Sequence, residues 1–182
     1  IQIMRIYEMD KCIKDLQIPC RWVPDMGYGY GYPLFNFYPV MPYYLGEAIH
    51  ILGFNLIWSV KIDFILSYLV AAITMFLLAR GFWGNLGGLI SSLFYLYAPY
   101  HAVDVYVRGA MAENWSLAWA PAVFLFIYRT IEKNSLTNIT FLALFSALFL
   151  MSHNPLALIF TPIMTVWALI LIWRFKKLAS IK

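Results

Sequence analysis

Long apolar stretches fill most of the chain after residue 57, and each of them predicts a membrane helix. They cover 58–79, 86–100, 115–129, 136–151 and 156–174. A helix needs roughly 20 predominantly apolar residues to cross a bilayer, so the third and fourth stretches are short. Those two either extend into the polar interface or form half-spans that neighbouring helices bury. The pattern predicts an all-α polytopic transmembrane protein, with about five membrane helices in residues 58–182 and an outer segment with amphipathic interface helices in residues 1–57.

Residues 1–17 have the spacing of an amphipathic helix. At about 100° per residue, one broad face collects Ile1, Ile6, Met9, Cys12, Ile13 and Leu16. Such a helix is expected to lie in the membrane interface. Arg5 projects onto the same apolar face, where a cation needs an anionic partner. Either a structural carboxylate or the phosphate of a ligand would serve, because a guanidinium suits bidentate phosphate contacts.

A segment rich in Gly, Tyr and Pro follows at residues 21–39, and its composition argues against a continuous helix. Tyr28, Tyr30 and Tyr32 alternate with glycines, which let the backbone turn tightly or approach a ligand closely. Flat rings with hydroxyl tips suit sugar rings or an isoprenoid tail. The alternative is an aromatic belt at the lipid headgroups, which explains neither the glycine spacing nor Asp25.

A second outer helix is expected to begin at Pro42, a residue that favours the first helical position. Within it, Glu47 and His50 are three residues apart and share one face. They are candidates for an acid/base pair or for two ligands of a metal ion. The alternative is a hydrogen-bonded pair near the interface.

Polar residues also occur in and between the apolar stretches. Asp63 lies inside the first stretch, where an ionisable residue is a functional candidate by default, although Lys61 nearby is consistent with a shallow position at the interface. His153 and Asn154 form the link between the fourth and fifth stretches. They either cap this turn or point toward a cavity at the outer face.

A further polar group lies between the second and third stretches. His101, Asp104 and Arg108 have the spacing of one helical face, so Asp104 is expected to hold both of the other side chains. Gly109 then ends the helix and Glu113 follows. This group is either an internally neutralised triad or a phosphate site with Arg108 as the anion ligand.

Basic residues predict the orientation. If alternate helix ends share a side, that side holds Arg80, Arg129, Lys133, Arg174, Lys176, Lys177 and Lys182, and the opposite short loops hold only Arg108. Cytoplasmic loops are enriched in Lys and Arg, so residues 1–57 are predicted to be extracytoplasmic. Every carboxylate except Glu132 falls on or near that outer side. Either the chemistry takes place there, or residues 1–57 carry most acids simply as the largest polar segment.

Composition narrows the class of protein. Hydrophobic residues make up 63% of the 182 residues and charged residues 12%, against about 25% charged in an average globular chain. So apolar a chain is expected in a membrane, with membrane lipid as a partner. No run of Lys and Arg resembles a nucleic-acid stripe, so nucleic acid is not an expected partner. An exterior location permits a disulfide between Cys12 and Cys20, but two cysteines are too few to assign one.

Several sequence blocks resemble a known family. They are R-W-V-P-D-M-G-Y-G-Y-G-Y-P-L-F-N-F-Y-P at 21–39, P-Y-Y-L-G-E at 42–47, A-P-Y-H-A-V-D-V-Y-V-R-G-A-M-A-E at 98–113 and S-H-N-P at 152–155. The chain is similar to a bacterial and archaeal family of polytopic membrane proteins labelled 6-pyruvoyl-tetrahydropterin synthase-related, a label that does not imply pterin chemistry. That family resembles the GT-C membrane glycosyltransferases, which use polyprenyl-phosphate sugars at the outer face. The resemblance implies that residues 1–57 belong to the first large outer loop. It also implies a further span and an acidic/His motif before Arg5, so we expect a fragment of a longer protein.

Two functional hypotheses follow. In the first, an outer-face glycosyltransferase, Asp25, Asp10 and Asp63 are the candidate catalytic bases, and Arg5 and Arg108 bind the lipid phosphate. A divalent metal is compatible with this chemistry. The other candidate substrate contacts are Tyr28, Tyr30, Tyr32, Glu47, His50, His101, Asp104, Glu113, His153 and Asn154. The second hypothesis is a non-catalytic membrane protein, such as a lipid-glycan carrier, a transport component or an assembly partner. A channel is not expected, because no stretch shows a repeated polar stripe.

Overall fold

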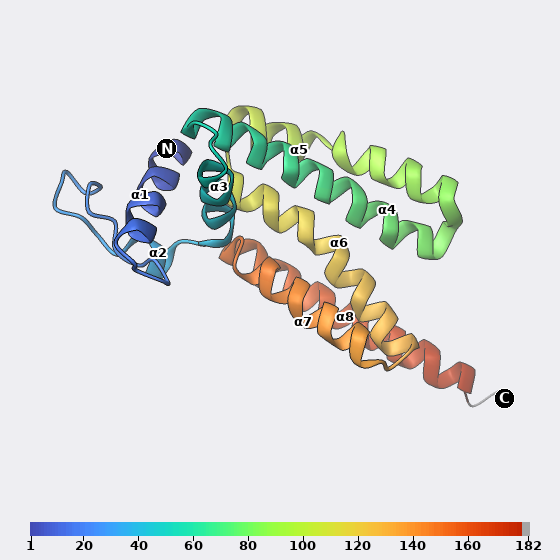
Figure 1. Cartoon of the computed structure of the whole chain (residues 1–182). Coiled ribbons are helices and arrows are strands. Elements are labelled where there is room, and N and C mark those ends of the chain that lie inside the picture. The colour runs from blue at the N-terminus through green and yellow to red at the C-terminus, as the bar shows by residue number, and fades with distance from the viewer. Residues whose placement is uncertain (180–182) are drawn as a thin grey trace.

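The computed structural model describes residues 1–179, and these fold almost entirely as helices (Figure 1). The elements are α1 (Gln2–Lys14), α2 (Leu34–Phe37), α3 (Met41–Ile51), α4 (Leu56–Leu96), α5 (Pro99–Ala102), η1 (Val103–Arg108), α6 (Met111–Glu132), α7 (Leu136–Leu150) and α8 (Asn154–Ala179). The predicted all-α class is confirmed. Lys182, which the orientation argument used, lies outside the described residues.

Helix α4 consists of two antiparallel arms. Its dihedral angles leave the helical region at Gly84, where φ is 70°, and Figure 1 shows the chain reversing direction there. The Ser92 hydroxyl of the second arm donates to the Ala72 carbonyl of the first at 2.9 Å. Gly88 lies so close to the Phe76 carbonyl that a Cβ would be 2.9 Å from its oxygen. The first two predicted stretches are therefore the arms of one hairpin.

Two helices are long and apolar enough to cross a membrane: α4, and the Asn154–Lys176 part of α8. Helix α7 is apolar but has 15 residues. Helix α6 has 22 residues, and a polar group of buried side chains lies in its first turns. The structure therefore supports candidate spans, and the full set of five membrane helices stays a prediction.

Helix α6 is the centre of the bundle. It packs against the first arm of α4 on one side and against α7 and α8 on the other. Small buried residues line its contacts, including Ala112, Ala118, Ala120 and Ala122. Small side chains let helix backbones approach closely, which is the usual basis of helix association in membranes.

Residues 1–54 cover one end of the bundle, which we call the capped end. The opposite end, which we call the basic end, carries the α4 turn and the ends of α6 and α8, with Arg80, Arg129 and Arg174 (Figure 1). The predicted sharing of one end by these three arginines agrees with the helix order. The topology does not by itself assign this end to a side of a membrane.

The apolar face of α1 packs against α3 instead of facing a lipid interface. Ile6 is fully buried, and a Cβ on Gly46 would lie 2.4 Å from its Cδ1 atom. The helix is shorter than predicted, because Leu16 takes a left-handed conformation with φ of 59° and its side chain is exposed. Protein therefore covers the apolar face at Ile6, Met9 and Cys12, and the place of this helix at the membrane interface stays a prediction.

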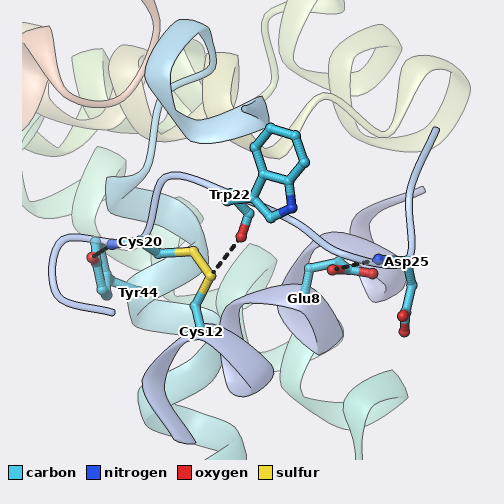
Figure 2. The surroundings of a disulfide bond; sticks show 6 residues. All are labelled: Glu8, Cys12, Cys20, Trp22, Asp25 and Tyr44. Atoms are coloured by element: carbon cyan, nitrogen blue, oxygen red, sulfur yellow. Dashed lines mark hydrogen bonds between the residues drawn. A yellow bond between two sulfur atoms is a disulfide. The ribbon is translucent and has the colours of Figure 1, made fainter. Parts of the chain in front are cut away.

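The segment between α1 and α2 is held by several cross-links. Cys12 and Cys20 form a disulfide with Cα atoms 5.5 Å apart (Figure 2). The Cys20 backbone N–H donates to the Tyr44 hydroxyl at 2.9 Å, which ties the disulfide to α3. Val23 and Tyr32 form an isolated antiparallel bridge with N···O distances of 3.0 and 3.1 Å. The disulfide that the sequence left unassigned is thus part of the fold.

Candidate functional site

A cluster of charged side chains lies at the capped end, where η1 leads into α6. The Arg108 guanidinium is 2.9 Å from a carboxylate oxygen of Asp104 and 2.8 Å from one of Glu113. Tyr100 donates its hydroxyl to the other oxygen of Glu113. Both carboxylates are buried, whereas the Arg108 side chain is 49% exposed. We call these four residues the Arg108 cluster; the predicted Asp104–Arg108 pair is confirmed within it.

The backbone around the cluster has an uncommon form. Residues Val103–Arg108 form a π-helix, and Gly109 ends it in a left-handed conformation with φ of 58°. The Ala110 N–H donates to the Asp104 carbonyl at 2.8 Å, and the Gln2 side-chain amide donates to the Gly109 carbonyl at 2.6 Å. Single π-turns occur frequently at functional sites. Gln2 at the start of α1 and the turn before α6 therefore both hold the end of η1 in place.

His101 does not bind Asp104 as the spacing predicted. Its Nδ1 atom lies 3.3 Å from the side-chain oxygen of Asn114, and its ring packs against Tyr68 and Tyr95. The reason is local: α-helical spacing assumes i→i+4 hydrogen bonds, and the wider i→i+5 turn rotates Asp104 away from His101. His101 thus joins the cluster region through α6 rather than through Asp104.

Burial sets the electrostatics of this region. Burial, reinforced by the nearby charge of Glu113, raises the pKa of Asp104 to about 7 in spite of Arg108. Burial lowers the pKa of His153, which is close enough to Glu113 and Arg108 for both charges to act on it. The Leu156 N–H points at its Nδ1 atom at 3.3 Å, so the imidazole caps the start of α8. Asn154 begins α8 and makes no described side-chain hydrogen bond.

Asp63 is separate from the Arg108 cluster. It is fully buried between α4 and α6, where the Trp115 indole N–H donates to one carboxylate oxygen at 3.1 Å. Its other oxygen has no partner in the described residues. Lys61 is exposed, lies near the Trp58 ring and forms no ion pair with Asp63. Asp63 is thus enclosed by protein, and its depth in the membrane stays a prediction.

Asp63 belongs to a buried polar stripe that the sequence analysis missed. The stripe runs along the first arm of α4 through Ser59, Asp63, Ser67 and Thr74. Its spacing of mostly four residues places these side chains on one helical face. Asn114 donates from α6 to the Ser67 hydroxyl. The expectation that no apolar stretch carries a polar stripe is therefore wrong. The recurrence of Ser59, Asp63 and Ser67 at every fourth position was the sequence pattern that indicated the stripe.

Arg5 contacts aromatic side chains and not the expected structural carboxylate. Its guanidinium carbon lies 3.9 Å from the centre of the Tyr38 ring, and Nη1 donates to the Tyr43 hydroxyl at 2.8 Å. The Tyr43 hydroxyl donates in turn to the Gln2 side chain at 2.7 Å. Aromatic faces attract cations through their quadrupole, so the two tyrosines stabilise the half-buried guanidinium, although its Nε atom has no hydrogen-bond partner in the described residues. Within residues 1–179 no carboxylate forms an ion pair with Arg5.

The two acids proposed as bases in the outer segment lie in ion pairs on the surface of that segment. Asp25 pairs with Lys11, and its backbone N–H lies 3.4 Å from a Glu8 carboxylate oxygen (Figure 2). Asp10 pairs with Lys14 at 2.6 Å. Neither acid meets Arg5 or Arg108 in a described contact. The structure therefore does not bring these bases to the predicted phosphate ligands.

Glu47 and His50 do not hydrogen-bond to each other. Glu47 is buried beside Asp10, and burial together with the Asp10 charge raises the pKa of Glu47 to about 7. The His50 Nδ1 atom lies 2.7 Å from the Phe54 carbonyl oxygen. The predicted acid/base pair is thus replaced by a carboxyl pair from α1 and α3.

The tyrosines of the Gly–Tyr segment point into solvent. Tyr28 is 103% exposed and Tyr30 is 88% exposed, whereas Tyr32 is partly packed at the Val23 bridge. Figure 1 shows this loop on the far side of α1, away from the helices that carry the Arg108 cluster. The choice between ligand contact and an aromatic belt at the lipid headgroups stays a prediction for these rings. The structure does not gather these rings around a shared site with Arg108.

Among the described residues, no group of three or more His, Cys, Asp or Glu side chains is placed to hold a metal ion. Three contributors at the capped end were not singled out from the sequence: Tyr100, Asn114 and Tyr43. Each is a neutral hydrogen-bonding side chain beside a charged one. Their positions follow from packing between elements distant in sequence, so no local pattern marked them.

Comparison with known proteins gives one match. A family model described as a 6-pyruvoyl-tetrahydropterin synthase related domain, membrane protein, matches residues 35–181. No curated protein and no solved structure matches the chain. The matched range includes α3, η1 and every helix of the bundle.

Proposed function

Because the chain belongs to the 6-pyruvoyl-tetrahydropterin synthase related family of membrane proteins, we propose that the Arg108 cluster binds a polyprenyl-phosphate sugar and supports glycosyl transfer at the outer membrane face. The observation that supports this proposal is the exposed guanidinium of Arg108, which contacts two buried carboxylates at the capped end. A cation that faces solvent can exchange a carboxylate for a phosphate. The carboxylates beneath it are the groups that acid/base chemistry requires.

The proposed reaction uses the cluster in two roles. An acceptor hydroxyl attacks the anomeric carbon of the sugar, forming a new C–O bond as the bond to the lipid phosphate breaks. Glu113 takes the hydroxyl proton, and the bond electrons leave with the phosphate oxygen, whose charge Arg108 stabilises. Asp104, with its pKa raised to about 7, stays largely protonated below that pH and keeps the cluster close to neutral. These roles replace those first assigned to Asp25, Asp10 and Asp63.

The membrane arrangement is part of the proposal. The two arms of α4, with α6, α7 and α8, correspond to the five predicted spans, and the basic end faces the cytoplasm. The capped end with residues 1–57 is then extracytoplasmic. The Cys12–Cys20 disulfide supports this side, because disulfides persist in oxidising compartments.

One observation favours a second candidate function, binding without chemistry. Arg108 is already neutralised by Asp104 and Glu113, as in an internally balanced structural group. A lipid-glycan carrier, transport component or assembly partner needs the bundle and its lipid contacts but no base. The two functions differ in whether Glu113 matters after the ligand has bound.

A transfer assay separates them. The purified chain, reconstituted in vesicles, is given polyprenyl-phosphate sugars, and both ligand retention and glycosyl transfer are measured. If the chain is a glycosyltransferase, Arg108→Ala should weaken retention of the polyprenyl-phosphate sugar. Glu113→Gln should lower transfer by about 100-fold or more and leave this retention unchanged. Arg21→Ala, an exposed arginine in the outer segment, is the matched control and should change neither. Retention that depends on Arg108 without any transfer by the wild type supports the carrier; full transfer by both variants refutes this site.

A further inference from the structure

A groove on the outside of the α4 hairpin lies next to the Arg108 cluster. Its volume is about 690 Å³, and its walls come from the first arm of α4, the end of the second arm and η1. This volume lies within the range of about 300–1,000 Å³ that small-molecule sites occupy. The groove is therefore large enough for a ligand.

The groove follows the first arm of α4. The first arm of α4 contributes Trp58, Lys61, Ile65, Tyr68 and Ala72 to its floor. These positions follow one helical face over 14 residues, a length of roughly 21 Å at 1.5 Å per residue. Apart from Lys61, its lining is aliphatic or aromatic. A strip of this shape fits one extended hydrocarbon chain.

The two ends of the groove differ in charge. The deep end is apolar at Ala72, and Lys61 stands near the rim with its ammonium 4.9 Å from the Trp58 ring centre. Within residues 1–179 no carboxylate forms an ion pair with Lys61. An unpaired cation at the mouth of an apolar strip complements an anionic headgroup.

The groove is also joined to the cluster through His101 and η1. Tyr68 lines the groove, donates its hydroxyl to the His101 carbonyl at 3.2 Å and packs against the His101 ring. Tyr106 lines the opposite wall from η1, the same π-helix that carries Asp104 and Arg108. A ligand in the groove therefore contacts the element that positions the cluster.

We propose that this groove binds the hydrocarbon chain of a lipid monophosphate, with the phosphate at the Lys61 rim and the chain end near Ala72. The inference rests on the proposed function for the chemical class of the lipid and on the groove for where its chain lies. Occupation of the groove orders η1 against α4 through Tyr68 and Tyr106. The groove holds the lipid before transfer, and its phosphate then moves from Lys61 to Arg108, the position that the proposed function requires.

The test uses geranylgeranyl monophosphate with a photoreactive diazirine at the chain end, added to phosphatidylcholine vesicles that contain the full chain. Labelled peptides are located by mass spectrometry. Labelling is expected on the groove faces of α4 and η1. Ala72→Phe and Ala102→Phe, which fill the groove from opposite walls, should each reduce it severalfold; Ala102 is exposed, so its replacement leaves the core intact. Lys61→Gln should weaken binding about fivefold, the effect of one basic residue beside an anionic lipid.

Matched controls carry the same substitutions elsewhere. Ala143→Phe on the exposed face of α7 and Lys133→Gln at the basic end should leave labelling unchanged. Equal labelling of the wild type and both Phe variants in the groove would overturn the proposal. Equal labelling by geranylgeraniol, or displacement by excess phosphatidylglycerol, would overturn the monophosphate assignment. Labelling requires no transfer, so loss of the proposed activity and loss of this site are read separately.

Discussion

The exposed guanidinium of Arg108 lies 2.9 Å from the fully buried carboxylate of Asp104, one turn earlier on the same π-helix. The pair therefore joins a solvent-accessible cation to a carboxyl group with no access to water. A second buried carboxylate, Glu113, completes the arrangement from α6. Arg108 and the half-exposed Tyr100 therefore link these buried acids to the protein surface.

Removing Arg108 should destabilise the chain. Arg108→Ala leaves two buried carboxylates without their cation; the expected loss is about 1–2 kcal/mol, below the ~3–5 kcal/mol of a wholly buried pair because Arg108 is half exposed. Thermal unfolding in detergent micelles measures the change. The double variant Arg108→Ala/Asp104→Asn should recover part of the loss, and a double variant less stable than the single one would contradict the pairing.

Raising the pH should lower the free energy of unfolding through Asp104 and Glu47. Their unfolded pKa values are about 3.9 and 4.3, and both are raised to about 7 in the folded chain. Between about pH 4 and 7 the folded chain holds protons that the unfolded chain has released, so this stabilisation is complete below pH 4 and is lost as pH rises through 7.

The measurement is the pH dependence of the melting temperature for the wild type, Asp104→Asn and Glu47→Gln. Each variant should show a flatter decline from about pH 5 to 8 than the wild type. His101 and His153 have lowered pKa values and act with the opposite sign below about 6.5, so the comparison between variants is decisive. Identical profiles for all three proteins would exclude these carboxyls as the source.

Gly46→Ala should separate α1 from α3. The added Cβ would meet Ile6 Cδ1 at 2.4 Å, and such overpacking costs about 1–3 kcal/mol. Gly81→Ala is the matched control in α4, where no atom lies within 4 Å of the added Cβ, and it should be neutral or stabilising by about 0.5–1 kcal/mol. Differential scanning fluorimetry of the two variants gives the comparison. Equal destabilisation by both would mean that the α1–α3 contact is not tight.

The disulfide should matter for the outer segment. Replacing Cys12 and Cys20 with Ser removes a cross-link over 8 residues, which the chain-entropy relation values at about 2.5 kcal/mol. Limited proteolysis within residues 15–33 should become faster, while cleavage in the basic end stays unchanged. Mass spectrometry of the unreduced wild type should find the two cysteines linked; free thiols in protein isolated from the membrane would refute the cross-link.

Sidedness can be tested at the Gly–Tyr loop. Tyr30→Cys places a thiol at an exposed tip, and a membrane-impermeant maleimide added to intact cells should label it. Lys133→Cys at the basic end should react only after the membrane is permeabilised. The reverse pattern would place the capped end in the cytoplasm and would remove the basis for outer-face chemistry.

Local sequence patterns were sufficient to predict the helices and the Asp104–Arg108 ion pair. Apolar runs predicted the helices of the bundle. A helix satisfies the hydrogen-bonding groups of its own backbone, so it needs only an apolar surface to lie in lipid. The spacing of Asp104 and Arg108 predicted their contact, because residues four apart on a helix lie on one face. The amphipathic periodicity of residues 1–17 likewise predicted α1, though not what would cover it.

Contacts between distant elements could be read only from the folded chain. The hairpin turn at Gly84 brings Ser92 to Ala72, the packing of α1 on α3 gives Arg5 its aromatic partners, and α6 supplies Glu113 to Arg108. Each depends on the direction in which one helix leaves another, and a change of a few degrees at a turn moves a side chain many ångströms away. The sequence sets which side chains are available on each helical face; tertiary packing selects which of them meet, because burial and close contact are properties of two surfaces together.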